Sequence, residues 1–192
     1  MELPVPSPLL SEQVLAARVE ELAQEISEDL AGVDEVLLVG VLKGAFVFLS
    51  DLARRLTIPR RIDFMAAAHY DGATPTAEVE LIMDLREDIR GKHVLLVEDI
   101  LDTGATLAKL LALLGARGPA SLKTCVLLSK RKPRPDGPVA DYVGFEIDDE
   151  WVVGYGLDYS DRYRSLPFVG VIDPPQPPPP PPTSAPSPPS TK

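Results

Sequence analysis

The chain has one cysteine, Cys125, and two histidines, His69 and His93, among its 192 residues. A single cysteine cannot build a disulfide framework, and two histidines without clustered partners do not predict a zinc site. No apolar run reaches the ~20 residues of a membrane-spanning helix. The first residues also lack the basic start and apolar stretch of a signal peptide. These absences lead us to expect a soluble protein of the cytoplasm.

Positive charge is also scarce, with 19 lysines and arginines against 29 acidic residues and a net charge of −10. This balance disfavours nucleic acid and anionic membranes as partners. Phosphate groups would be bound locally, through backbone amides, a few placed cations, or a divalent metal shared with carboxylates.

No G-x-G-x-x-G follows an early strand, which disfavours a dinucleotide-dependent oxidoreductase. No G-x-x-x-x-G-K-[ST] is present, which disfavours a nucleoside triphosphatase of the P-loop type.

Proline is concentrated at the C-terminal end, where eleven of the 21 prolines follow Asp173. Residues 174–192 carry no aliphatic side chain larger than alanine, so nothing apolar is available to offset the entropy of ordering. We therefore predict one folded domain over residues 1–173 and a disordered or polyproline II tail over residues 174–192. A proline-motif ligand for a partner protein is the alternative interpretation of the tail.

The apolar pattern before the tail alternates between helix and strand periodicity. Residues with helical spacing predict an N-terminal helix; they are Leu15, Val19, Leu22, Ile26 and Leu30. Apolar runs and alternation predict strands, and two further periodic segments predict helices. The strands are expected at 35–41, 61–68, 78–84, 93–99 and 121–128. A helix is expected at 45–56, a loop passing into a helix over 103–115, and a loop at 69–78. This order predicts an α/β fold with a mostly parallel twisted sheet flanked by helices, binding ligands beyond the carboxyl ends of its strands.

The segment VLLVEDILDTGATL, residues 94–107, carries the most specific chemistry. Its apolar strand delivers Glu98 and Asp99, two adjacent acids that can hydrogen-bond vicinal hydroxyl groups. The following turn, from Thr103 to Thr106, opens a helix, and its amides and hydroxyls can bind a phosphate at the positive helix end. The combination predicts a site for a sugar phosphate. In isolation, the acids could equally be surface residues and Thr103 a helix cap.

The sequence VEDILDTGATL resembles the phosphoribosyl diphosphate signature of type I phosphoribosyltransferases, in its hypoxanthine-guanine form. Adenine-specific relatives typically carry a small residue where this chain has Asp102. The similarity continues through residues 39–48, 129–135 and 141–173. It implies a type I phosphoribosyltransferase-like fold with a small hood. It also implies a purine salvage reaction, in which phosphoribosyl diphosphate and hypoxanthine or guanine give IMP or GMP and pyrophosphate.

The resemblance also implies roles for individual residues. Asp102 would face purine N7 as the general acid or base, and Tyr70 would lie in a loop that closes over the reacting centre. The peptide bond before Lys43 is often cis in the family. Magnesium (Mg2+) would be the cofactor, with Glu98, Asp99 and Asp158 at the metal. The residues implied to bind the donor are Leu42, Lys43, Gly44, Tyr70, Glu98, Asp99, Thr103, Gly104, Ala105, Thr106 and Arg164.

Three residues are implied to bind the base. Lys130 would donate a hydrogen bond to the purine O6, Trp151 would stack on the ring, and Val152 would supply backbone contacts. A lysine donor rejects a 6-amino group, because two donors would face each other and leave the ammonium unsatisfied. Without the family pattern, Lys130 would be interpreted as part of a solvated basic cluster and Trp151 as a core residue.

Two positions depart from the family pattern, because His69 replaces a common serine and Ala105 replaces a basic or polar residue. The first affects the expected loop closure, and the second shifts phosphate binding towards amides and the hydroxyls of Thr103 and Thr106. The expected partners are the small-molecule substrates and further copies of this chain in a dimer or tetramer. Three alternatives stay open: a xanthine-preferring transferase, a non-catalytic regulator that senses the donor, and an adaptor that acts through its tail.

Overall fold

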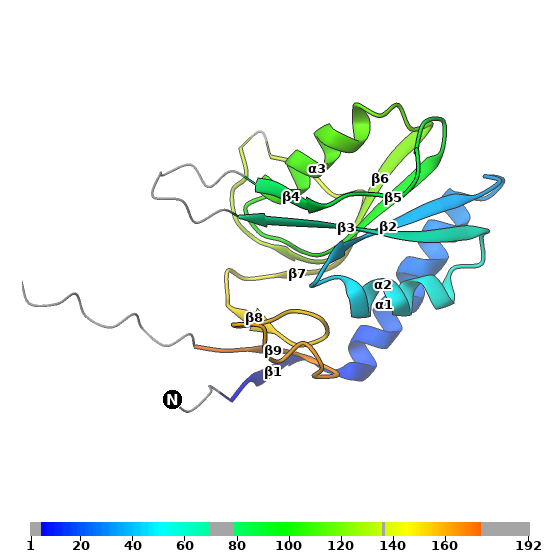
Figure 1. Cartoon of the computed structure of the whole chain (residues 1–192). Helices are drawn as coiled ribbons and strands as arrows, with labels where there is room; N and C mark the ends of the chain where they lie inside the picture. The colour runs from blue at the N-terminus through cyan, green and yellow to red at the C-terminus, as the bar shows by residue number, and fades with distance from the viewer. Residues whose placement is uncertain (1–4, 70–78, 136, 174–192) are drawn as a thin grey trace, which may run out of the picture.

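The computed structural model describes residues 5–69, 79–135 and 137–173, and its elements form two sheets and three helices (Figure 1). The predicted tail lies outside these ranges, so its state and the domain boundary remain predictions. Within the described ranges, no helix combines the length and apolar character needed to cross a membrane. The elements are β1 Ser7–Leu10, α1 Glu12–Asp29, β2 Val36–Leu42, α2 Phe46–Arg55, β3 Arg60–His69, β4 Val79–Met83, β5 His93–Leu101, α3 Ala105–Gly115, β6 Ser121–Lys130, β7 Tyr142–Ile147, β8 Val152–Val153 and β9 Val169–Val171.

The large sheet has the strand order β4-β3-β2-β5-β6-β7. All of its neighbouring pairs are parallel except β3 with β4, which is antiparallel. Because the parallel strands run in one direction, β2, β5 and β6 end at the same edge of the sheet. This arrangement confirms the predicted mostly parallel α/β fold and puts the expected ligand-binding edge beyond Leu42, Leu101 and Lys130.

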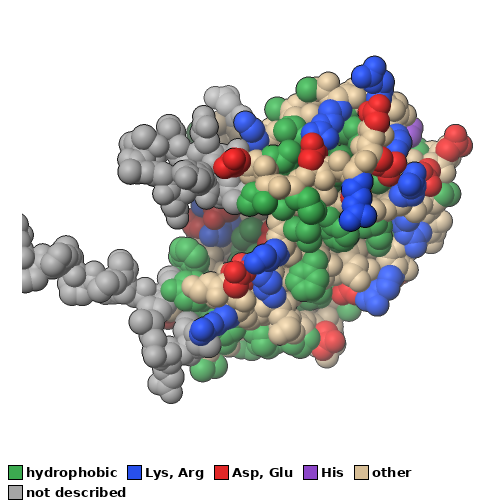
Figure 2. Space-filling model, viewed as in Figure 1, with side chains coloured by type: hydrophobic (Ala, Val, Ile, Leu, Met, Phe, Trp, Pro, Cys, Tyr) green, Lys and Arg blue, Asp and Glu red, His purple; other side chains and the backbone are tan. Residues whose placement is uncertain are grey.

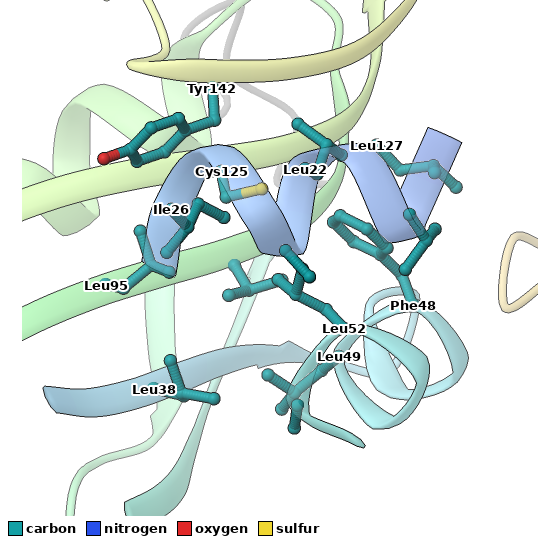
Figure 3. Close-up of a cluster of buried hydrophobic side chains, with 14 of the residues drawn as sticks. Leu22, Ile26, Leu38, Phe48, Leu49, Leu52, Leu95, Cys125, Leu127 and Tyr142 are labelled. Carbon is teal, nitrogen blue, oxygen red and sulfur yellow. The ribbon is translucent and has the colours of Figure 1, made fainter. Parts of the chain in front are cut away.

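Helices cover both faces of the large sheet, as the alternation of strands and helices predicts. Figure 1 shows α3 on one face and α1 with α2 on the other. The predicted apolar face of α1 is buried, and Figure 3 shows Leu22 and Ile26 in the same cluster as Phe48 of α2 and Cys125 of β6. Burial raises the pKa of the Cys125 thiol, so this cysteine is an unreactive packing residue. A second apolar cluster, under α3, includes Leu107.

A small antiparallel sheet with the order β1-β9-β8 lies beyond the β7 side of the large sheet (Figure 1). It pairs Ser7 near the chain start with Val171 near the end of the described chain. This sheet matches the small hood that the resemblance implies. Its strands have only two to four residues, and the apolar pattern alone does not predict them.

The strands differ from their predicted bounds at functionally important ends. β5 continues to Leu101 and β6 to Lys130, two residues beyond each predicted strand. The expected loop over 69–78 begins one residue too early, since His69 ends β3, and the rest lies outside the described residues. On the face shown in Figure 2, basic and acidic side chains are interspersed rather than gathered into one basic surface.

Candidate active site at the carboxyl edge of the sheet

A cavity of about 480 Å³ opens at the edge of the sheet where β2 and β5 end. The ends of these strands and the turns that follow them line it, together with Ala67 of β3 and two residues from the region before β9. The sequence-predicted residues on its wall are Leu42, Lys43, Gly44, Glu98, Asp99, Asp102, Thr103, Gly104, Thr106, Asp158 and Arg164. The structure therefore brings together eleven of the predicted site residues around one hollow.

The turn after β2 lies unusually close to the acidic pair. A Cβ atom on Gly44 would lie 1.6 Å from Asp99 Oδ2, so a larger residue at this position would force the Asp99 carboxylate to move. Gly156, with φ of 105°, approaches in the same way, because its Cβ would lie 2.1 Å from the carbonyl oxygen of Gly44. The Leu42–Lys43 peptide bond is cis, as the resemblance implies. Gly44 thus lies against the carboxylate of Asp99, and the backbone of Gly156 lies against that of Gly44.

Glu98 and Asp99 are adjacent acids with raised pKa values. Burial raises the pKa of Glu98 to about 8, and the charge of Asp99 adds to this shift. Burial also raises the pKa of Asp99 to about 6, although the Ile100 amide, which donates to Asp99 at 2.9 Å, and the charge of Arg164 oppose it. No donor among the described residues lies within hydrogen-bond distance of Glu98 Oε2. The pair therefore has unused capacity to bind hydroxyl donors or a cation.

The turn between β5 and α3 has the geometry expected for binding an anion. Gly104 precedes α3 with φ of 85°, and its Cβ would lie 2.9 Å from Pro138 Cδ, so glycine is required twice over. The amide of Ala105 donates to Thr103 Oγ1 at 3.3 Å. Thr103, Gly104 and Thr106 line the cavity, whereas Ala105 does not. The first turn of α3 therefore faces the cavity with hydroxyls and the positive end of a helix.

A second cavity, of about 220 Å³, adjoins the first. The two share the wall residues Asp99, Asp102 and Asp158, together with Ile100. The remaining wall includes the three residues predicted to bind a base, Lys130, Trp151 and Val152. The sheet edge thus offers two neighbouring compartments, one lined by carboxylates, hydroxyls and two cations and one by an aromatic ring and a lysine.

Trp151 is not a core residue, because 59% of its surface is exposed. Its ring meets that of Tyr159 edge-on, with centroids 6.4 Å apart and an interplanar angle of 88°. The interpretation of Trp151 as a core residue is therefore wrong. Its exposure leaves ring surface available for stacking inside the smaller cavity.

Lys130 is buried and paired, so it does not belong to a solvated basic cluster. Its ammonium lies 2.8 Å from Asp149 Oδ1 and 3.3 Å from Asp102 Oδ2. Lys132 contacts the other oxygen of Asp102, and this contact raises the pKa of Lys132. Lys130 in turn lowers the pKa of Asp149. Asp102 and Lys130 are thus held side by side in a network of two acids and two lysines.

Arg134 is the first functional candidate that the sequence does not reveal. Its Nη1 group donates to the backbone carbonyls of Leu101, Asp102 and Lys130 at 3.3, 3.1 and 2.8 Å. Its Nη2 group donates to Ser129 Oγ at 3.0 Å. One guanidinium therefore joins the ends of β5 and β6. The partners are mainly backbone carbonyls, which no side-chain motif in the sequence identifies.

Asp161 is the second such candidate. Its Oδ1 atom accepts hydrogen bonds from Lys43 Nζ at 2.9 Å and from Arg164 Nη2 at 3.1 Å. These two cations, Lys43 first, lower the pKa of Asp161. Arg164 also contacts Asp158 Oδ1 at 2.7 Å and donates to the carbonyl of Gly156 at 2.8 Å. No sequence motif pointed to Asp161, because its partner Lys43 is 118 positions away.

Two predicted features fall outside what the structure describes or differ from it. Tyr70 lies outside the described residues, so its place in a closing loop stays a prediction, as does the effect of His69. Ala105 occupies the first position of α3 without lining the cavity. Among the described residues, no three acidic, histidine or cysteine side chains are grouped closely enough to hold a metal by themselves.

Comparisons with known proteins identify relatives over most of the chain. The Phosphoribosyl transferase domain family matches residues 8–160. The chain is 46% identical over 166 residues to the hypoxanthine phosphoribosyltransferase of Salmonella typhimurium, covering 85% of this chain and 93% of that protein. It is 43% identical over 178 residues to the hypoxanthine-guanine phosphoribosyltransferase of Mycobacterium avium, covering 88% of this chain and 87% of that protein.

Solved structures show the same likeness. A hypoxanthine-guanine phosphoribosyltransferase from Bacillus anthracis superimposes with a TM-score of 0.83 at 42% identity, covering 88% of this chain and 99% of that chain. The hypoxanthine phosphoribosyltransferase of Trypanosoma cruzi gives a TM-score of 0.84 at 38% identity, covering 91% and 94%. The likeness thus includes both sequence and fold over nearly the same length.

Proposed function

Since this chain belongs to the phosphoribosyltransferase family, we propose how the paired cavities at its sheet edge carry out the reaction of its relatives. That reaction transfers the 5-phosphoribosyl group from phosphoribosyl diphosphate to hypoxanthine or guanine, and it yields IMP or GMP and pyrophosphate in purine salvage. The observation that carries the proposal is the shared wall of the two cavities, because Asp99 and Asp102 border both compartments. A sugar held in one would face a base held in the other.

The larger cavity would hold the donor. Glu98 and Asp99 would accept hydrogen bonds from the ribose hydroxyls, which suits a buried pair with an unpartnered oxygen. Thr103 and Thr106, with the amides of the turn, would bind the 5′-phosphate at the start of α3. Lys43 and Arg164 would bind the pyrophosphate that leaves.

The smaller cavity would hold the base. Trp151 would stack on the purine ring, Val152 would contact it through its backbone, and Lys130 would donate to O6. Asp102 would accept the N7 proton as N9 forms its bond to the ribose C1′, and would return it in the reverse direction. Lys130 lies 3.3 Å from this carboxylate, which supports a single group of side chains that recognises both N7 and O6 of a 6-oxopurine.

Magnesium fits the acidic lining of the larger cavity, and we propose that Glu98, Asp99 and Asp158 serve it. The described residues contain no complete protein cage for a metal. This suits Mg2+, which usually keeps several waters and binds through one or two carboxylates together with substrate phosphates. When bound, the ion would stabilise the negative charge that develops on the pyrophosphate.

Two further parts of the proposal concern the state of the protein. We propose a homo-oligomer, either a dimer or a tetramer, since work on the Trypanosoma cruzi enzyme concerns the role of its C-terminal region in oligomeric state and activity. Light scattering at several protein concentrations tests this assembly.

We also propose a cytoplasmic location, because a chain with one buried cysteine has no need of an oxidising compartment.

A product assay tests the function directly. The protein is incubated with magnesium, phosphoribosyl diphosphate and one base at a time, and the nucleotides are separated by chromatography. We expect IMP from hypoxanthine or GMP from guanine and little AMP from adenine. Xanthine is included because a xanthine-preferring enzyme would give XMP fastest. Absence of any purine nucleotide, with a related active enzyme as positive control, would refute the proposal.

A further inference from the structure

Asp161 pairs with Lys43 and Arg164, the two cations that the proposed function assigns to the leaving pyrophosphate. A single carboxylate oxygen accepts from both Lys43, at 2.9 Å, and Arg164, at 3.1 Å. This is the geometry that a phosphate oxygen would take between a lysine and an arginine. Asp161 therefore stands where an anionic ligand would be expected to bind.

The backbone around Asp161 directs its carboxylate towards these cations. Its φ of 59° lies in the left-handed region, where aspartate and asparagine are among the best tolerated residues other than glycine. Its amide donates to Asp158 Oδ2 at 2.7 Å, and Tyr159 pairs with Arg162 across the turn. The position of the carboxylate is thus set by a hydrogen-bonded turn rather than by a flexible side chain alone.

The charges of the cluster balance when no ligand is bound. Lys43 and Arg164 are compensated by Asp158 and Asp161, so the cluster has no net charge. We propose that Asp161 is a built-in competitor for pyrophosphate, which holds Lys43 and Arg164 together in the empty enzyme and is displaced when the diphosphate group binds. The inference rests on the proposed function, because it concerns the same pyrophosphate site.

Because the ion pair between Lys43 and Asp161 is exposed, displacing Asp161 costs little free energy. The side chains of Lys43 and Asp161 are 66% and 67% exposed, and ion pairs at such positions are weak because water screens them. A diphosphate group, which carries several negative charges, therefore outcompetes one carboxylate. The competition lowers the affinity for pyrophosphate below what the two cations alone would give, and so it favours release of this product.

The variant Asp161→Asn tests the competition because it removes the charge while keeping the shape and the tolerance of the left-handed backbone. Isothermal calorimetry measures the binding of pyrophosphate with magnesium to the full-length chain. We expect the variant to bind pyrophosphate about threefold more tightly than the wild type at low salt, with the gain shrinking as salt rises. Damage to the fold would weaken binding, so a gain in affinity cannot come from structural disruption.

Three comparisons make the result specific. Asp34→Asn removes one exposed acid before the opposite end of β2, which is roughly 20 Å long, and it should leave pyrophosphate affinity unchanged. Binding of IMP, whose phosphate is assigned to Thr103 and Thr106, should change less than pyrophosphate binding in Asp161→Asn. In a Lys43→Met background, Asp161→Asn should give a smaller gain, because one of the cations for which it competes is missing.

The outcomes separate this inference from the proposed function. A wild-type protein that makes nucleotide, together with an Asp161→Asn variant that binds pyrophosphate equally well or more weakly, overturns the inference alone. An equal gain in Asp34→Asn also overturns it, because the effect would then come from net charge. A wild-type protein that makes no nucleotide in the product assay overturns the proposed function, and the inference with it.

Discussion

Glu98 shows at the scale of one residue how a binding site lowers the stability of a protein. Burial raises the pKa of Glu98 from 4.5 to about 8, so the folded protein retains a proton that the unfolded chain releases above pH 4.5. The folded state then binds more protons than the unfolded state between these two values. Stability must therefore fall as pH rises through this interval.

We predict that Glu98→Gln removes this loss of stability, because an amide is neutral at every pH. Each pKa unit corresponds to about 1.4 kcal/mol, so by pH 8 the variant should be more stable than the wild type by several kcal/mol. Urea unfolding without ligands or divalent metal, at pH 5, 6.5 and 8, measures the difference. Glu35→Gln, an exposed acid before β2, is the control. Equal pH dependence in Glu98→Gln and wild type would contradict the prediction.

Trp151 is the only tryptophan of the chain, and its exposed ring gives a direct signal for base binding. If the purine stacks on Trp151, then IMP or GMP should shift or quench the emission saturably, and AMP should need a much higher concentration. A stacking platform contributes about 1–3 kcal/mol per base. We therefore predict that Trp151→Ala loses affinity of this order, whereas Trp151→Phe retains most of it.

Calorimetry with GMP provides the independent measurement for Trp151. Tight GMP binding without any change in emission, combined with wild-type affinity in Trp151→Ala, would place the base elsewhere. The preference for 6-oxo over 6-amino bases should survive in Trp151→Phe, because Lys130 rather than the ring discriminates them.

At the scale of elements, the sequence predicts strands and helices whose burial is continuous. The strands β2, β5 and β6 are long apolar runs because helices cover both faces of the sheet, and α1 shows the apolar spacing of a helix with one buried face. The strands β1, β8 and β9 could not be predicted in this way. They are short, and Ser7 becomes part of a strand only by pairing with Val171.

The residues of the candidate site also fall into those that the sequence predicts and those that it misses. The family motif predicted the acids, the turn and the lysines near the ends of β2, β5 and β6, because these residues lie in contiguous segments. Arg134 and Asp161 were missed because their roles depend on tertiary geometry. Arg134 binds carbonyls of two strands, and Asp161 meets a lysine from a distant turn.

Arg134 carries the prediction that belongs to this scale, because it joins the ends of β5 and β6 and so sets the spacing of Asp102 and Lys130. In Arg134→Gln, carbonyls now bound by the guanidinium would lose charged donors worth roughly 1.5–3 kcal/mol each. We predict a loss of about 2 kcal/mol or more in the free energy of unfolding and at least a ~10-fold slower single-turnover rate. Urea unfolding and rapid-quench kinetics measure the two quantities.

A matched control lies three positions away. Arg131→Gln removes the same charge from the same segment, but Arg131 is exposed. It contacts the exposed acids Asp148 and Glu146, and it also donates to the carbonyl of Glu146 at 3.0 Å. Both quantities should therefore change little. Arg134→Lys keeps the charge without the planar fork and should recover only part of the rate. Equal effects of Arg131→Gln and Arg134→Gln would show that Arg134 does not position the site.

At the scale of the whole molecule, the composition of residues 5–173 differs from that of the predicted tail, and so does what each can contribute to stability. Among the described residues, one apolar cluster packs α1 and α2 on the large sheet and a second packs α3 on it. A chain of this length buries roughly 70% of its unfolded surface and needs no further core. Residues 174–192, which are mainly proline, serine and threonine, offer almost no apolar surface for packing.

We therefore predict that removing residues 174–192 leaves turnover within about 20% and shifts the melting temperature by less than ~2 °C, since a change below ~0.5 kcal/mol has no larger effect in a domain of this size. Calorimetry and steady-state kinetics with hypoxanthine measure both quantities.

A variant in which a glycine-serine segment of equal length replaces the tail separates the effect of proline from that of length. If truncation lowered the melting temperature by several degrees while the glycine-serine variant behaved like the truncated chain, the proline sequence itself would dock on the folded domain. Light scattering on the same proteins would then show whether that docking occurs within one chain or between copies, because only the second would change the oligomeric state on truncation.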